Sequence, residues 1–498
     1  MGMHPVVPAI VLALAIVRML AGGVSWLTFV SIPLAMLWLV VEIRGWTARR
    51  ESEDSDAAPP APVRTPEQAE ELRTAVDMLH RMRETAGQPP AVPSEEQIRA
   101  TAQPAIYVHR SDLAVPLDHP ARSYLGGLPR LPAEMPWPEI EKHERFPLTF
   151  LAQIDLAELP VVEASPLPRS GTLYFFADTH ADSPEPTDCS VLYYAGDTAR
   201  VPIRDVPAGT RAAGDDGGTW PWLPQDSVWA RAGFRFPLTF SVFDSYRDYT
   251  IQEGAKHPPT RNRSVHEQLT GAEFTRRFGA PAAGAREILQ RLWKDGGDWP
   301  FAWIVVEYAA RALAYAVERA TAYRGEDVAA ALRATGEGAA KWIARAGREE
   351  PCAPCDAATQ AEFLQEWRSL VAEFEAINRR LQLHARKPAD SRADVVIAAC
   401  HACASHGAAD VLPPVYRDAL AQLNDPRGNH TRHQMLGHGE KVQSAPIEYR
   451  DQILLLQLMA DTGLGWHPGG GCALQFWVDP AAAARAAFDA VAMTLECD

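Results

Sequence analysis

The chain is almost continuously apolar over residues 6–43, where only Arg18 and Glu42 carry a charge. A bilayer core of ~30 Å needs roughly 20 helical residues, and the run Val24–Ile43 meets that length. The run before it, Val6–Leu20, would span only about 22 Å at the helical rise per residue. The segment therefore predicts a membrane anchor whose partner is lipid.

Residues 1–45 allow two kinds of anchor. Gly22-Gly23 separates the two apolar runs and would permit a tight turn, which predicts a transmembrane helical hairpin. One span plus an interfacial segment is the alternative, and a hairpin buried in a soluble core is a third. A cleaved signal peptide fits poorly, because the N-terminus has no basic region and the apolar stretch is too long.

The orientation of the anchor follows from the charges behind it. Arg44, Arg49 and Arg50 come directly after the second apolar run, and basic residues next to a span stay on the cytoplasmic side. We therefore expect an inner (cytoplasmic) membrane location, with the body of the protein facing the cytoplasm.

Residues 46–104 have the composition of a linker that contains one amphipathic helix. Thr65-Pro66 resembles a helix start with proline at the first position, and the apolar stripe from Leu72 to Met82 has helical spacing. A helix over residues 66–86 is expected, either packed on the main body or in a juxtamembrane coiled coil.

The remaining chain changes pattern twice and predicts an α+β body. Residues 105–255 contain short aromatic and β-branched runs between turn residues, which are strand signals. Residues 256–423 contain long helical stretches rich in Ala, Leu, Arg and Glu, and residues 424–498 return to strands. We expect two β-rich halves interrupted by a long, all-helical insertion.

The two strand-rich parts resemble each other. Each has a glycine-containing loop, then an apolar strand with one glutamine, then an aromatic strand that ends in aspartate. The first copy is Ser123–Gly127 (SYLGG), Phe150–Asp155 (FLAQID) and Tyr174–Asp178 (YFFAD). The second copy is His433–Gly437 (HQMLG), Leu454–Met459 (LLLQLM) and Gln475–Asp479 (QFWVD). Self-similarity of this kind indicates two related halves.

At these residues the chain resembles the YwqG-like domain family, a bacterial family without an established function. The first matching block is Ser123–Pro132, Trp137-Pro138, Pro147–Leu156 and Gly171–Phe176. The second is His433–His438, Leu454–Leu458 and Gly471–Val478. The resemblance implies an α+β domain with pseudo-duplicated β-rich halves, and it carries over no catalytic residue. The anchor, the helical insertion and the cysteine pairs depart from the family's compact pattern.

Four of the seven cysteines form two C-x-x-C pairs, Cys352/Cys355 and Cys400/Cys403. Four thiolates in such pairs are a common zinc site, so zinc is the expected cofactor, if one is bound. The expected helix lengths argue against a meeting of the two pairs at one metal ion. The helix after Cys355 would be about 36 Å long, and the helix that returns to Cys403 only about 16 Å. Buried structural thiols and redox dithiols stay open as alternatives.

The charge and motifs favour a binding role. A net charge of −15 argues against a nucleic-acid partner, which needs a basic surface. No phosphate loop, Ser/His/Asp order or paired-carboxylate pattern stands out. We expect a membrane-anchored binding or scaffold protein with a protein partner, and as the alternative an enzyme with a cleft between the halves, metal-assisted or using a dithiol. The candidate ligand-binding residues are Gln153, Asp155, Gln457, His433 and His438.

Overall fold

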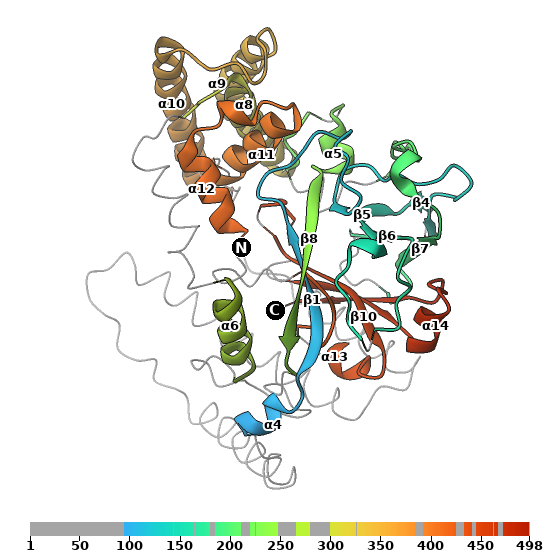
Figure 1. Ribbon diagram of the computed structural model, residues 1–498. Helices are drawn as coiled ribbons and strands as arrows, with labels where there is room; N and C mark the ends of the chain where they lie inside the picture. The colour runs from blue at the N-terminus through green and yellow to red at the C-terminus, as the bar shows by residue number, and fades with distance from the viewer. Residues whose placement is uncertain are drawn as a thin grey trace, which may run out of the picture. The chain divides into compact units, whose positions relative to one another are not determined.

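The computed structural model describes the chain between residues 94 and 497, with gaps (Figure 1). The described residues are 94–142, 144–163, 165–179, 185–210, 220–224, 226–247, 265–278, 299–324, 326–383, 392–424, 433–440, 445–461, 463–466 and 472–497. The predicted anchor over residues 6–43 and the predicted helix 66–86 lie outside them. Within the described ranges, no helix combines the length and apolar character needed to span a bilayer.

Ten antiparallel strands form one sheet, in the order β12-β11-β10-β9-β1-β8-β2-β5-β6-β7. They are β1 (Gln103–Arg110), β2 (Tyr124–Leu125), β5 (Thr149–Asp155), β6 (Thr172–Ala177), β7 (Cys189–Tyr194), β8 (Phe236–Ser245), β9 (Gln434–Leu436), β10 (Ile453–Met459), β11 (Ala473–Val478) and β12 (Ala492–Glu496). A separate hairpin consists of β3 (Glu139–Glu141) and β4 (Arg145–Pro147). Every residue of β6 and β11 is buried, which explains why these strands read as continuous apolar runs.

The sheet is symmetric about its central pair, β1 and β8. Outward from this pair, β9 matches β2, β10 matches β5, β11 matches β6, and β12 matches β7. Tyr124 pairs with Gln153 across β2 and β5, as Gln434 pairs with Gln457 across β9 and β10. The α+β class and the duplication predicted from the sequence are therefore confirmed.

The turn after the first short strand of each half shows why glycine recurs there. Gly127 and Gly437 have φ angles of 68° and 65°. A Cβ on Gly127 would lie 2.8 Å from Cβ of Arg235, and one on Gly437 would lie 2.6 Å from Cβ of Ala105. The residue before each also has φ 62°, glycine in the first half and Leu436 in the second. Positive φ and close backbone approach both require glycine at the second position.

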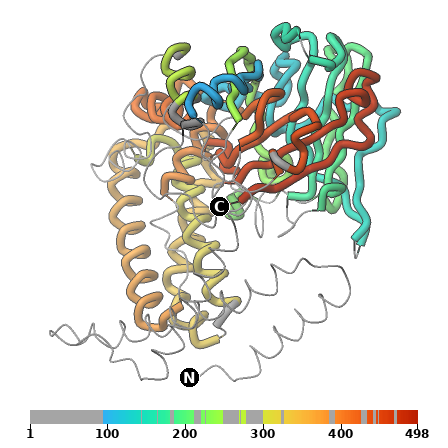
Figure 2. The backbone as a smooth tube through the Cα atoms, turned by 90° about the horizontal axis from the view of Figure 1, so that it is seen from below, coloured from blue at the N-terminus to red at the C-terminus, as the bar shows by residue number. Residues whose placement is uncertain are grey.

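The two outer strands of the sheet approach each other. Met493 N in β12 donates to the carbonyl of Pro186, just before β7, at 2.8 Å. The rings of Phe175 and Phe476, from opposite halves, are in edge contact at 5.2 Å. The sheet therefore curls around a core shared by both halves, as the red and green strands in Figure 2 show. This closure leaves less open strand edge for pairing with another chain.

Most of the helices lie between β8 and β9 in the chain. They are α6 (Val265–Phe278), α8 (Trp303–Arg324), α9 (Glu326–Ala346), α10 (Ala357–Leu381), α11 (Arg392–Ser405) and α12 (Pro414–Leu423). The shorter helices are α4 (Glu95–Arg99), α5 (Val228–Ala232), α13 (Ala445–Glu448) and α14 (Pro480–Ala484). Asp356 caps the N-terminus of α10, where its side chain accepts from Thr359 N, and α11 is buried from Val395 to Ala404. An apolar helix without a polar face belongs in a core, and α8 to α11 pack together (Figure 1).

Candidate functional site

A buried glutamine binds the glycine loop of the first half. Gln153 Oε1 accepts hydrogen bonds from Arg130 N at 2.9 Å and from the hydroxyl of Tyr124 at 2.7 Å. Its Nε2 donates to the carbonyl of Arg122 at 2.8 Å. The Gln153 side chain has no exposed surface, so these bonds stabilise the loop from inside.

The second half repeats this arrangement with different neighbours. Gln457 Oε1 accepts from Glu440 N at 2.7 Å and from Gln475 Nε2 at 2.9 Å. Glu440 therefore occupies the place that Arg130 has in the first half. Because the bond recurs in both halves, we attribute the two glutamines to the framework that the halves share.

The residues before the two loops also correspond. Ser123 Oγ accepts from Asp155 N at 2.9 Å, and His433 Nδ1 accepts from Met459 N at 3.1 Å. The carboxylate of Asp155 also accepts from Ala157 N at 2.9 Å. These contacts hold the end of β5 and of β10 against the preceding strand.

The five predicted ligand-binding residues are not gathered at one place. Gln153 and Asp155 lie on β5, Gln457 lies on β10, and His433 and His438 lie on either side of β9. His438 Nε2 is 2.8 Å from the carbonyl oxygen of Thr101. A ligand role for these residues stays a prediction, and their visible contacts are with the protein's own framework.

Among the described residues, the second half contains a buried ion pair, Arg110–Asp461, that the first half does not repeat. Arg110 on β1 binds Asp461 through both Nε (2.5 Å) and Nη2 (2.8 Å). The two side chains are 1% and 2% exposed, and the guanidinium lies 5.2 Å from the ring centre of Phe236. Burial alone would raise the pKa of Asp461, but the charge and hydrogen bonds of Arg110 hold it well below its usual range.

Every polar atom of the Asp461 carboxylate is engaged. Oδ1 also accepts from Gly463 N at 2.8 Å, and Oδ2 is 3.3 Å from Nε2 of His433. His433 thus has one ring nitrogen on Asp461 and the other on Met459 N. With both nitrogens occupied, this Asp–His pair has the residue types of a general base but no site for an incoming proton.

A second buried histidine joins the ion pair to the helices. His401 on α11 has Nε2 2.7 Å from the carbonyl of Gly463, and Ala114 N donates to its Nδ1 at 3.4 Å. Its ring makes an edge contact with Phe236 at 4.8 Å. Burial first, and then the positive charge of Arg110, lower the pKa of His401 to about 3. The imidazole is therefore neutral in the folded protein at any ordinary pH.

We expect His401 to make the fold sensitive to mild acid. Between pH 6.5 and about 3 the unfolded chain binds a proton on this histidine that the folded chain does not, so stability falls as pH falls. The slope is about 1.4 kcal/mol per pH unit over that window. Replacing His401 with phenylalanine or glutamine should remove this part of the slope, measured by urea unfolding at several pH values. An unchanged slope in both variants would exclude His401 as its source.

The four paired cysteines lie in one hydrophobic core of the helical region. The thiol of Cys403 hydrogen-bonds to the sulfur of Cys352, which lowers the pKa of Cys352. Burial raises the pKa of Cys355 to about 12. All four cysteines are buried and unbridged. No group of three or more His, Cys, Asp or Glu side chains in the described segments is arranged to hold a metal ion, and zinc stays a prediction.

Two half-buried arginines in the loops of the first half bind carbonyl groups. Arg130 Nη1 donates to the carbonyl of Val201 at 2.9 Å, and Arg204 Nη1 donates to that of Met135 at 2.6 Å. Arg204 N also donates to Pro129 O at 2.9 Å. Across the described residues, neither guanidinium forms an ion pair with a carboxylate.

Arg235, next to them, is a fully buried cation. Its guanidinium stacks on the ring of Tyr124 at 3.7 Å. It donates to the carbonyls of Leu117 and Ala121, while its Nε has no partner. Burial lowers the pKa of Arg235, and the charge of Arg130 adds to this effect. We call Arg130, Arg204 and Arg235 the loop arginines.

Three other arginines of the first half differ, because each has a carboxylate partner. The pairs are Arg122–Asp155, Arg145–Glu139 and Arg231–Asp205. Among the described residues, the loop arginines form no such ion pair, although the negative charge of Asp118 lies near Arg235. Chemically, such a group favours a carboxylate or phosphate, because arginine presents several donors in a fixed plane.

Sequence reasoning missed the buried ion pair and the loop arginines. Arg110 and Asp461 are 351 residues apart, and no local pattern relates them. Arg130 did have a signal, since it lies three residues after Gly127 and the second half has Glu440 three residues after Gly437. That difference in charge at matching positions was available from the repeat.

Comparison with known proteins identifies a family for this chain, and that family has no assigned activity. The model of a family described as a domain of unknown function (DUF1963) matches residues 123–295 and 312–497, which is more than half of the chain. The second segment begins inside α8 and includes α9 to α12. A search of curated proteins found no match.

Proposed function

This chain belongs to the DUF1963 family, and we propose that it is a membrane-anchored binding protein that recognises an anionic group of a partner. The closer YwqG-like assignment and the cytoplasmic orientation belong to this proposal. The observation that carries it is the set of loop arginines, of which Arg130 and Arg204 form no ion pair with a carboxylate among the described residues.

The chemistry of the loop arginines suits an anionic ligand. Arg130 and Arg204 each have one Nη nitrogen fixed on a backbone carbonyl, so their guanidinium planes are held before any ligand arrives. Both side chains are half-buried, where charge is screened less than on an open surface. Preorganised donors lose little conformational entropy on binding. Each should contribute a charge-assisted hydrogen bond to a carboxylate.

The second half lacks this feature at the matching place. Glu440 takes the position of Arg130, and its backbone N makes the equivalent bond to Gln457. The two halves thus share a framework and differ in the charge that the loop presents. An acidic segment of a protein partner is the ligand that we propose for the first half.

We expect membranes that contain the full chain to bind a fluorescein-labelled hexaglutamate peptide saturably, and less tightly as salt is raised. Arg130→Gln and Arg204→Gln should each weaken binding about tenfold, because each removes a charge-assisted hydrogen bond worth about 1.5 kcal/mol. Fluorescence anisotropy on resuspended membranes measures this. Deleting residues 1–45 should release the protein from the pellet.

Arg145→Gln is the matched control, since Arg145 is exposed and already paired with Glu139. It should leave the affinity unchanged. Equal losses in all three variants, or no saturable binding, would contradict the proposal. Competition by inorganic phosphate alone, without binding of the peptide, would point to a free anion and not to an acidic partner.

A further inference from the structure

Arg130 is held by hydrogen bonds on both sides of its Cα atom. Its backbone N donates to Gln153 Oε1 at 2.9 Å, and the hydroxyl oxygen of Tyr124 lies 3.1 Å from the same nitrogen. On the other side, the hydroxyl of Tyr174 donates to the Arg130 carbonyl at 2.7 Å. Because the peptide groups on both sides are fixed, the direction in which the side chain leaves the backbone is fixed as well.

Tyr174 is well placed to make this bond. It lies within β6, has no exposed surface, and belongs to a buried hydrophobic cluster that also contains Trp137 and Phe176. Burial raises the pKa of Tyr174, so the hydroxyl keeps its proton and stays a donor. A buried tyrosine hydroxyl requires a hydrogen-bond partner, and here that partner is the backbone of a loop arginine.

The second half repeats this bond with a different residue. Tyr174 pairs with Gln153 across β5 and β6. At the matching place, Gln475 pairs with Gln457 across β10 and β11. The Nε2 of Gln475 donates to the Glu440 carbonyl at 2.7 Å. Both halves therefore hold one loop residue at its N–H and at its carbonyl, and in the first half that residue is a loop arginine.

The far end of the Arg130 side chain is fixed too. Its Nη1 donates to the carbonyl of Val201 at 2.9 Å. One guanidinium nitrogen is thereby occupied, and the bonds to the backbone help to decide where the other donors point. Donors that are oriented before a ligand arrives lose little conformational entropy on binding. Without the Tyr174 hydroxyl, the peptide group after Arg130 could turn and redirect these donors.

We propose that Tyr174 is a positioning residue of the anion site, which holds Arg130 in the orientation that binds the acidic group of a partner. This inference rests on the function proposed for the loop arginines. Tyr174 has no exposed surface with which to contact a ligand, and it acts through the Arg130 carbonyl.

The experiment is a double-mutant cycle on membranes that contain the full chain, with the labelled hexaglutamate peptide as the probe. Tyr174→Phe keeps the ring and removes the hydroxyl, and it should weaken binding about fivefold, the typical effect of losing one neutral hydrogen bond. In the Arg130→Gln background the same change should weaken binding less than about twofold, because the side chain that Tyr174 positions is gone. A full fivefold loss in both backgrounds would indicate a general structural role and overturn the proposal.

Tyr193→Phe is the matched control. Tyr193 lies on the neighbouring strand β7, and its hydroxyl donates to the carbonyl of Ser170 at 3.1 Å, so this variant removes a similar bond away from Arg130. It should bind the peptide as tightly as the unmodified chain, and equal losses in Tyr193→Phe and Tyr174→Phe would contradict the proposal. Urea unfolding in mild detergent, followed by tryptophan fluorescence, shows whether each variant is folded.

A second variant tests the donor itself. Tyr174→Gln installs the amide that Gln475 uses at the matching place. Since it restores a donor to the Arg130 carbonyl, its affinity should stay within about threefold of the unmodified chain. A larger loss in the folded variant would count against the inference, and this comparison stands even where Tyr174→Phe does not fold.

Failure of this inference is distinguishable from failure of the proposed function. If the unmodified chain does not bind the peptide saturably, the proposed function is wrong and the inference with it. If the unmodified chain binds, Arg130→Gln weakens the binding and Tyr174→Phe does not, only the positioning role of Tyr174 is overturned.

Discussion

Replacing Asp461 with alanine should lower the free energy of unfolding by about 3–5 kcal/mol, the range for removing one partner of a buried ion pair. The variant would leave the Arg110 guanidinium, 1% exposed, without its carboxylate. It would also leave the N–H group of Gly463 without its acceptor. Urea unfolding of the full chain in mild detergent, followed by tryptophan fluorescence, measures the effect.

A double variant separates the ion pair from its surroundings. Arg110→Met with Asp461→Leu removes both charges and should recover much of the loss, since apolar replacements of buried pairs are often neutral. Asp451→Ala is the control, because Asp451 is 93% exposed and lies 3.8 Å from Arg450. It should change stability by less than about 1 kcal/mol. Equal effects of Asp461→Ala and Asp451→Ala would contradict the role assigned to the buried pair.

Local patterns in the sequence predicted the individual elements closely. The helical stretches expected in residues 256–423 include α8 (Trp303–Arg324) and α10 (Ala357–Leu381). The expected aromatic strand Tyr174–Asp178 overlaps β6 (Thr172–Ala177). Helical and strand periodicity are set by neighbours a few residues apart, so a single sequence contains this information.

The arrangement of these elements was predicted only where the chain repeats itself. The matching glutamines indicated two related halves, but nothing local places β1 between β8 and β9. The N-terminal strand of the unit thereby completes the second half, whose other strands come more than 300 residues later. Pairings across such distances depend on complementary surfaces, and one sequence does not reveal them.

For the candidate sites too, local spacing was visible in the sequence and contacts between distant residues were not. The C-x-x-C spacing singled out four cysteines that all lie in one hydrophobic core, and a zinc or redox role for them stays a prediction. Spacing gave no sign of the bridge between Cys472 and Cys497, which are 25 residues apart. A single bridge forms here without the dense cysteine pattern that is typical of disulfide-rich domains.

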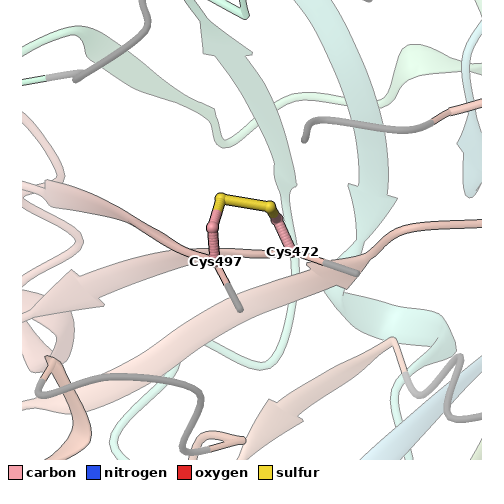
Figure 3. Close-up of a disulfide and its surroundings, with 2 residues drawn as sticks. All are labelled: Cys472 and Cys497. Atoms are coloured by element: carbon pink, nitrogen blue, oxygen red, sulfur yellow. A yellow bond between two sulfur atoms is a disulfide. The ribbon is translucent and has the colours of Figure 1, made fainter. Parts of the chain in front are cut away.

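The disulfide and the proposed orientation favour different cellular compartments. Cys472 and Cys497 flank β11 and β12, so their bond closes the outer hairpin of the second half (Figure 3). Disulfides persist in oxidising compartments and are rare in the cytoplasm. The arginines at 44, 49 and 50 predict a cytoplasmic body. Trapping thiols in intact cells therefore reports on location: alkylation of Cys472 and Cys497 supports the cytoplasmic side, and protection of both supports export.

The bond should matter for stability wherever it is formed. Closing a loop of this length stabilises a folded chain by about 3 kcal/mol. Replacing both Cys472 and Cys497 with alanine should therefore lower the free energy of unfolding by about that amount. The urea midpoint measures the loss. Amide exchange should also rise in β12, whose Met493 N closes the sheet against Pro186.

Chemical reduction provides the decisive comparison for this prediction. A thiol reductant should lower the urea midpoint of the unmodified chain to that of the double alanine variant, and it should leave the variant unchanged. Cys189→Ala is the control, since Cys189 lies on the neighbouring strand β7 without a bridge. If the reductant destabilises the double variant as much as the unmodified chain, the effect comes from other cysteines. If neither changes, β12 is held by its backbone pairing with β11 and by the core alone, and the bridge contributes nothing measurable.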